Sequence, residues 1–267
     1  MSEPVTHWKA TVAYDGTEFA GWQVQDNQRT VQGEIEAALS RIANQPIRVQ
    51  GAGRTDSGVH AFGQVCSFAW PGEPEARLRH AASKMLSPAI RVVELERVDA
   101  EFSARFSAKD KCYRYAIDAA PEPHPLAARF AWHVPFKLDL DRVRPLLEVL
   151  RGKHDFAGFE STGSQMESTV RTLFDVRLIE GEGIVTPEGY GGLNSFEFHG
   201  DGFLYKMVRN LTGTLIEIAR GRFEPEFIAE ALESGGPFGG HCAPPHGLAL
   251  MRVNYDSASA PVTRSTT

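Results

Sequence analysis

The stretch Gly51-Ala52-Gly53-Arg54-Thr55-Asp56-Ser57-Gly58-Val59-His60-Ala61 places three glycines around a guanidinium and a carboxylate. Glycine allows backbone conformations that other residues avoid, and it lets a ligand approach closely. Apolar and polar residues alternate on both sides, so we expect a loop between two strands. Polar side chains on such a loop are typical of a functional site. A second interpretation, a tight turn in which Asp56 bonds its own backbone, stays open on these residues alone.

On the N-terminal side of this stretch, the pattern predicts a strand followed by a helix. Alternation over residues 8–14 indicates a half-buried strand, which ends at the turn signal 15–17. Thr30 is placed to cap a helix whose apolar stripe runs over 31–42, and Pro46 marks its end.

Towards the C-terminus the pattern predicts further strands and helices. The expected elements are a strand to Trp70, a helix from Pro74 to Leu86, strands at 92–98 and 112–117, a helix at 143–150, strands near 176–179 and 196–198, a helix at 204–220, a short helix after Pro225 and a strand at 248–253. The order strand, helix, strand, strand, helix, strand thus appears about twice. We therefore predict an α+β protein with two similar split-βαβ halves, residues 1–105 and 106–255, and a disordered tail at 256–267.

Composition is that of a soluble globular protein. The 267 residues are 42% hydrophobic and 23% charged, and the formal net charge is −6. This charge is unusual for a nucleic-acid-binding protein, although local clusters matter more than the sum. Arginines gather near Arg77 and Arg105. An acidic body with one basic cleft and a protein that binds no polyanion both agree with these numbers.

Several classes of site have no support in the sequence. The three cysteines are far apart and form no Cys-x-x-Cys pair, which predicts free thiols in a reducing cytoplasm. No Walker loop, complete dinucleotide fingerprint, nucleophile elbow or metal-binding histidine spacing is present. No apolar run approaches the roughly 20 residues that span a bilayer. We therefore expect no cofactor, no metal and no membrane association.

The predicted helix at 204–220 offers a possible partner for Asp56. Its apolar residues share one arc, whereas Lys206, Arg209 and Gly213 fall nearly opposite. Cations on such a face are often simply solvated. Arg209 is alternatively a candidate partner for an anion in a polar cleft, and Gly213 would let another segment pack closely.

The strand at 112–117 offers an aromatic candidate. Tyr113 and Tyr115 share one face, which is typical of a core with hydroxyl groups at its edge. Cations at Lys109, Lys111 and Arg114 flank them, and aromatic rings among cations also suit stacked nucleobases. Both interpretations remain open.

Six groups of residues together resemble the tRNA pseudouridine synthase A family. They are Tyr14-Asp15-Gly16-Thr17, Gly21-Trp22-Gln23, Thr30-Val31-Gln32-Gly33, the Gly51–Asp56 stretch with His60-Ala61, Tyr113-Arg114-Tyr115 and Met207-Val208-Arg209-Asn210. The resemblance runs in order from about residue 8 to 254. It implies a pseudouridine synthase fold with ferredoxin-like or RRM-like halves forming a mainly antiparallel sheet flanked by helices. It also implies a cytoplasmic homodimer without cofactor or metal, acting on uridines 38, 39 and 40 in the anticodon stem-loop of tRNA.

The same resemblance implies roles for individual residues. Asp56 matches the catalytic aspartate, Tyr113 the tyrosine that stacks on the target base, Arg209 the partner of the aspartate and Arg54 an RNA contact. Further RNA contacts are expected at Arg77, Arg105, Arg171, Lys206 and Leu248. Two positions depart from the family pattern, because Ser57 stands where alanine is common and Lys206 where histidine is frequent.

A single carboxylate suits this isomerisation, which needs neither redox chemistry nor an energy source. Asp56 can act as a nucleophile or as a base, and the residues do not choose between attack on C1′, attack on the base and removal of a ribose proton. An RNA-binding module without catalysis is one alternative. A carbohydrate hydrolase is another, but such enzymes usually need two carboxylates.

Overall fold

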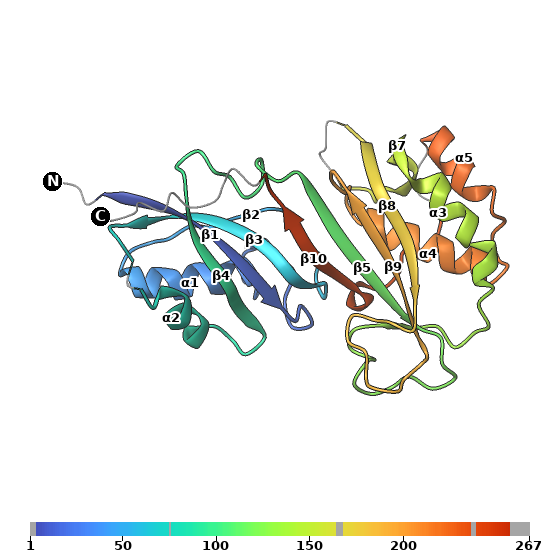
Figure 1. Cartoon of the computed structure of the whole chain (residues 1–267), viewed down its shortest axis with the longest axis horizontal. Coiled ribbons are helices and arrows are strands. Elements are labelled where there is room, and N and C mark those ends of the chain that lie inside the picture. The colour runs from blue at the N-terminus through green and yellow to red at the C-terminus, as the bar shows by residue number, and fades with distance from the viewer. Residues whose placement is uncertain (1–3, 75, 164–167, 236–238, 257–267) are drawn as a thin grey trace, which may run out of the picture. The chain divides into compact units, whose positions relative to one another are not determined.

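The computed structural model describes residues 4–74, 76–163, 168–235 and 239–256 (Figure 1). The chain divides into two compact units, one of Met1–Lys109 with Leu250–Thr267 and one of Asp110–Ala249. The boundary expected from the sequence, after residue 105, lies a few residues before this division at Lys109. The sequence did not predict that the last strand returns to the first unit. The tail expected at 256–267 lies outside the described residues except for Asp256.

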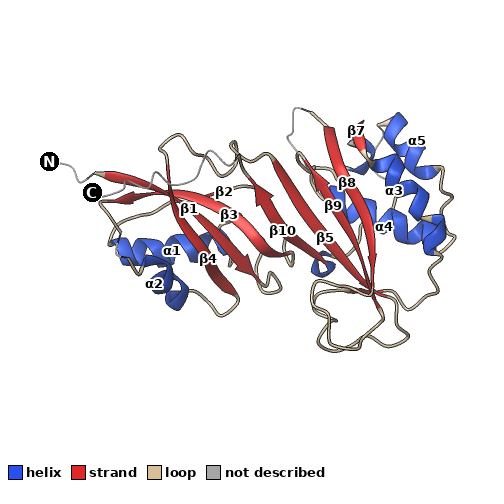
Figure 2. Ribbon diagram, in the orientation of Figure 1, coloured by secondary structure: helices blue, strands red, loops and turns tan. Residues whose placement is uncertain are grey.

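The first unit contains a mainly antiparallel sheet and two helices. Its elements are β1 (Val5–Tyr14), α1 (Val31–Ala43), β2 (Gln50–Gly51), β3 (His60–Pro71), α2 (Leu78–Met85) and β4 (Ile90–Val98). Strand β1 lies between β4 and β3 and is antiparallel to both, and β2 pairs with β3. Strand β10 (Leu248–Asn254) follows β3 in the sheet order. This is the predicted β-α-β-β-α-β order, with the Asp56 loop between β2 and β3 (Figure 2).

Helix α1 begins and ends where its sequence predicts. The Thr30 side chain accepts a hydrogen bond from the Gly33 N–H, which satisfies one of the unpaired donors of the first turn. Asn44 follows the helix in a left-handed conformation at φ 51°, and its N–H donates to the Ser40 carbonyl.

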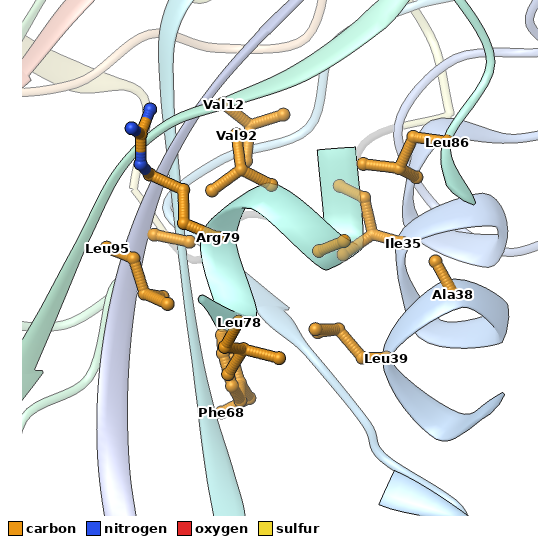
Figure 3. Close-up of a pocket in the computed structure, with 12 residues that line it drawn as sticks. Val12, Ile35, Ala38, Leu39, Phe68, Leu78, Arg79, Leu86, Val92 and Leu95 are labelled. Carbon is orange, nitrogen blue, oxygen red and sulfur yellow. The ribbon is translucent and has the colours of Figure 1, made fainter. Parts of the chain in front are cut away.

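Apolar side chains of α1 and α2 form the core of this unit against the sheet (Figure 3). The residues that meet there include Val12, Ile35, Leu39, Phe68, Leu78, Leu86 and Val92. They leave a cavity of about 10 Å³, barely the volume that one water molecule requires. This space is a packing gap and not a ligand site.

In its described residues, the second unit also contains a mainly antiparallel sheet with helices, and it has three α-helices where the first unit has two. Its elements are β5 (Asp110–Asp118), β6 (Trp132–His133), α3 (Arg144–Leu150), β7 (Gly152–Asp155), β8 (Val170–Glu180), β9 (Leu193–Gly200), α4 (Met207–Ala219) and α5 (Phe227–Ser234). The strand order β5-β9-β8-β7 is antiparallel throughout, and the short β6 runs parallel to β5. Helices α3, α4 and α5 lie together beside this sheet (Figure 1). The α+β class predicted from sequence is confirmed.

Helix α4 differs from its prediction in two respects. It begins at Met207 and not at Leu204, because Lys206 adopts a left-handed conformation at φ 60°. Lys206 therefore does not share a helical face with Arg209. The face opposite the apolar arc is also buried, since a Cβ on Gly213 would lie 1.7 Å from the His241 carbonyl oxygen. The close packing expected at Gly213 is thus confirmed.

Among the described residues, no helix is both long and apolar enough to cross a membrane.

Candidate active site

The backbone that carries Asp56 is held from both sides. The Thr55 carbonyl accepts a hydrogen bond from the Trp22 N–H at 3.0 Å, and the Asp56 carbonyl accepts one from the Val59 N–H at 3.1 Å. The Thr55 hydroxyl is buried and shares a 2.8 Å hydrogen bond with the Tyr14 hydroxyl. Strand β1 and the loop that follows it thus position the aspartate before any substrate binds.

Two glycines of that following loop make the close approach possible. Gly21 has φ 93°, and a Cβ there would lie 2.6 Å from the Thr55 carbonyl oxygen. A Cβ on Gly16 would lie 1.9 Å from the Val59 carbonyl oxygen. Larger residues would push the two loops apart. The Asp-Gly-Thr and Gly-Trp motifs therefore support the Asp56 loop, a function that their turn chemistry alone does not indicate.

Asp56 is half-buried, and its neighbour Ser57 is exposed. The Ser57 hydroxyl donates a hydrogen bond to the Phe19 carbonyl at 3.1 Å. The Gly58 N–H donates to the same carbonyl, and Gly58 has φ 79°. Serine at position 57 thus adds a hydrogen bond to the loop that an alanine side chain cannot make.

Arg54 lies on the same loop but extends into solvent. Its Nε donates a hydrogen bond to the side-chain oxygen of the half-buried Gln23 at 3.2 Å. Gln23 belongs to the Gly21-Trp22-Gln23 group quoted above, but no role was expected for its side chain. An exposed guanidinium held in this way suits contact with a phosphate group.

Tyr113 lies on β5 in the second unit and is 8% exposed. Its ring meets the Phe203 ring nearly at right angles, at 79°, with the centroids 5.0 Å apart. This is the edge-to-face geometry that aromatic pairs prefer. Phe203 fixes the tyrosine ring but was missed from sequence, because it lies in a loop without periodicity and 90 positions further along the chain.

Arg209 lies in the first turn of α4 and is half-buried. Its Nε donates to the Ala243 carbonyl at 2.8 Å, and the Ala243 N–H donates back to the Arg209 carbonyl at 3.1 Å. The Tyr115 hydroxyl donates to the Pro244 carbonyl at 2.7 Å. Ala243 thus holds the Nε of the guanidinium, and the Tyr115 hydroxyl holds the next residue of that segment.

The positive charge of Arg209 affects the pKa of Tyr115. Burial raises the pKa of Tyr115 well above its usual value, and the nearby Arg209 guanidinium opposes part of that rise. Gly247 packs directly on the same ring, since a Cβ there would lie 2.6 Å from a ring carbon. Tyr115 is therefore a core residue beside Arg209, in line with the core interpretation of this side chain.

The expected RNA contacts in the second unit occupy different surroundings. Lys206 places its ammonium 4.9 Å from the centre of the Tyr205 ring. Arg171 is half-buried at the start of β8, where its side chain donates to the Ser168 carbonyl at 2.9 Å. Leu248, the first residue of β10, is buried.

The expected contacts in the first unit lie on separate elements from the Asp56 loop. Arg77 is exposed and directly precedes α2. Arg105 is exposed in the connection after β4, with its guanidinium 5.2 Å from the centre of the Phe106 ring. RNA contacts by these residues stay predictions. Among the residues that the structure describes, no group of three or more acidic, histidine or cysteine side chains could hold a metal ion.

Comparison with known proteins adds independent evidence. The family model for tRNA pseudouridine synthase matches residues 10–107 and 147–256. The tRNA pseudouridine synthase A of Lacticaseibacillus casei is 42% identical over 94% of this chain and 100% of its own length. The enzyme of the same name from Exiguobacterium is 41% identical, over 93% of this chain and 97% of its own. That from Streptococcus pneumoniae is 40% identical, over 94% and 100%. The chain therefore belongs to the tRNA pseudouridine synthase family, the enzymes that isomerise uridine in tRNA.

Proposed function

We propose that this enzyme converts uridine to pseudouridine at positions 38, 39 and 40 of the tRNA anticodon stem-loop, with Asp56 as its catalytic carboxylate. The observation that carries the proposal is the support of the Asp56 loop. Trp22 bonds the Thr55 carbonyl, Tyr14 bonds the Thr55 hydroxyl, and Gly21 packs closely against the same carbonyl. Such preorganisation is what a catalytic group requires, because a misplaced group loses much of its effect.

The reaction moves bonds without net change in composition. The N1–C1′ bond breaks, the uracil rotates and a C5–C1′ bond forms, after which C5 loses its proton and N1 carries one. Asp56 serves this sequence as nucleophile or base. As nucleophile its carboxylate bonds to C1′ or to the base, and as base it takes a ribose proton. Each route needs one ionised carboxylate at the nucleoside and no second acid.

Tyr113 and Arg209 complete the proposed site. The target base leaves its stack, which costs a few kcal/mol, and stacking on the Tyr113 ring offsets part of this cost. Arg209 supplies the positive charge that compensates the Asp56 carboxylate once a bound base shields it from water. The hydrogen bond from the Arg209 Nε to the Ala243 carbonyl supports this role, because it holds the guanidinium in place before a substrate binds.

Cationic side chains then hold the RNA backbone. Arg54 contacts phosphate beside the target nucleotide, and we expect Arg77, Arg105, Arg171 and Lys206 to add further contacts, with Leu248 beside the substrate. The active form is a homodimer in the cytoplasm, as the family resemblance implies.

Conversion of defined tRNA tests the proposal. Three unmodified transcripts each carry uridine at only one of positions 38, 39 and 40, and a fourth lacks uridine at all three but keeps it elsewhere. Nucleoside analysis is expected to find pseudouridine in the first three and none in the fourth. Pseudouridine in the fourth transcript would contradict the proposed position. Binding of the first three transcripts without conversion would contradict the proposed reaction.

A further inference from the structure

The loop between β9 and α4 presents an exposed aromatic ring on a firmly held backbone. Tyr205 is 41% exposed. Its carbonyl accepts a hydrogen bond from the Ser161 N–H at 3.1 Å. Asp201, at the start of the loop, exchanges two bonds with Thr172, one from its own N–H at 3.0 Å and one to its carboxylate at 2.9 Å. The backbone that carries the ring is therefore held at both of these points of the loop.

This ring lies near the proposed site of base stacking. Phe203, two residues earlier, contacts the Tyr113 ring with the centroids 5.0 Å apart. Two residues of extended chain span at most about 7 Å between Cα atoms. Leu204, between them, is buried and turns inward. The loop thus places one aromatic ring on Tyr113 and presents the next one to solvent.

A cation accompanies the exposed ring. The Lys206 ammonium lies 4.9 Å from the centre of the Tyr205 ring. Lys206 itself has φ 60°, a conformation that residues other than glycine seldom adopt and that tends to cluster at ligand sites. An exposed aromatic ring with a cation over it offers the two groups that a nucleotide needs, because an aromatic ring stacks on the base and a cation contacts the phosphate.

We propose that Tyr205 is a second stacking platform, which binds the nucleobase adjoining the target uridine, while Lys206 contacts the phosphate of that nucleotide. The proposal rests on the proposed function. Enzymes that extrude a base from its stack also hold the flanking nucleotides, and their choice of sequence context comes partly from those contacts. Every base has a face that can stack, so Tyr205 contributes affinity with little preference for the neighbouring base.

Fluorescence of a modified RNA tests this platform. Two probes are used, each an unmodified anticodon stem-loop RNA. One carries 2-aminopurine in place of the nucleotide before the target uridine, and the other carries it in place of the nucleotide after it. The fluorescence emission of 2-aminopurine reports stacking. Tyr205→Ala is expected to raise the Kd about tenfold, in line with loss of one base–aromatic stack, and to abolish the emission change. Tyr205→Phe is expected to retain both. Phe174→Ala is the control, because Phe174 is a 52% exposed aromatic on β8 of the same unit, and it should behave as the wild-type enzyme.

Pseudouridine formation by the wild-type enzyme, measured on the same stem-loop without 2-aminopurine, separates the two proposals. If the wild-type enzyme isomerises the RNA but Tyr205→Ala binds the probes with unchanged Kd and emission, the platform is wrong and the proposed function stands. If the wild-type enzyme binds without isomerising, the proposed function is wrong, and the Tyr205 comparison still decides whether the ring stacks. Equal loss in Tyr205→Phe and Tyr205→Ala would overturn stacking in favour of a role for the hydroxyl.

Discussion

At the scale of single residues, Tyr113 allows the ring and the hydroxyl to be tested apart. The ring packs against Phe203, and stacking of a base on an aromatic ring contributes about 1–3 kcal/mol. Tyr113→Phe is therefore expected to retain capture of the target base, whereas Tyr113→Ala loses it. Binding of stem-loop RNA and single-turnover conversion measure both. Equal and mild effects of the two substitutions would place Tyr113 away from the substrate.

Arg209 is expected to matter for conversion more than for folding. Removing one member of a desolvated ion pair costs about 3–5 kcal/mol, so Arg209→Ala should lose most activity at neutral pH. Its Nε bond to Ala243 is only one of the contacts that hold this segment. Conversion rate and thermal unfolding of the variant, measured side by side, distinguish the two effects. An active Arg209→Ala enzyme would contradict the pairing with Asp56.

At the scale of elements, the sheet of the second unit carries a charge row that links three strands. Glu197 on β9 is 4% exposed and accepts hydrogen bonds from Arg114 on β5, at 3.0 Å, and from Arg177 on β8. Burial alone would raise the pKa of Glu197, but the bonds from Arg177 and Arg114 outweigh burial and lower it. The row therefore stabilises the folded state whenever Glu197 is ionised.

The pH dependence of this stabilisation has a definite sign. Because the pKa of Glu197 is lower in the folded than in the unfolded chain, the contribution is complete above the ordinary glutamate pKa of 4.5 and is lost as the pH falls through the folded value. Glu197→Gln is expected to lower the free energy of unfolding by about 1.5–3 kcal/mol at neutral pH. Denaturant unfolding of the variant and the wild-type protein, from neutral to acid pH, measures this difference. Glu182→Gln is the control, because Glu182 also pairs with Arg114 but is exposed. A difference from the wild-type protein that does not shrink in acid would contradict the assignment.

Elements with strong local signals could be predicted from sequence, and elements set by tertiary contact could not. Thr30 and Pro46 indicate the two ends of α1, which runs from Val31 to Ala43, and alternation identifies the longer strands. Strands β6 and β7, of 2 and 4 residues, are too short to show periodicity. The start of α4 was placed too early, because nothing in the sequence indicates that Lys206 leaves the helical conformation.

At the scale of the whole molecule, the site was predictable only through the family resemblance. The residue pattern alone identified a glycine-rich loop with a carboxylate, a tyrosine strand and a cation on a helix. It did not exclude an RNA-binding module without catalysis or a carbohydrate hydrolase. The match to the tRNA pseudouridine synthases decides between these classes. The supports for the site, such as Phe203 against Tyr113 and Gly21 against Thr55, join residues far apart in the chain and have no local signature.

The overall charge of −6 makes the salt dependence of RNA binding informative. If a few cationic side chains contact phosphate on an otherwise acidic protein, the logarithm of the binding constant falls linearly with the logarithm of salt concentration. Arg54→Ala is expected to reduce that slope by about 1 and to weaken binding to all stem-loops alike. Filter binding over a salt series measures it. A slope unchanged by the substitution would remove Arg54 from the RNA contacts.

The substitution Asp56→Asn tests whether the Asp56 carboxylate performs the chemistry. The substitution preserves the size of the side chain and the backbone bonds that hold the loop, but it removes the nucleophile or base. Nucleoside analysis of stem-loop tRNA after prolonged incubation is expected to find no pseudouridine, while binding of the RNA and thermal unfolding of the variant stay close to those of the wild-type enzyme. Pseudouridine formed at close to the wild-type rate would contradict the account.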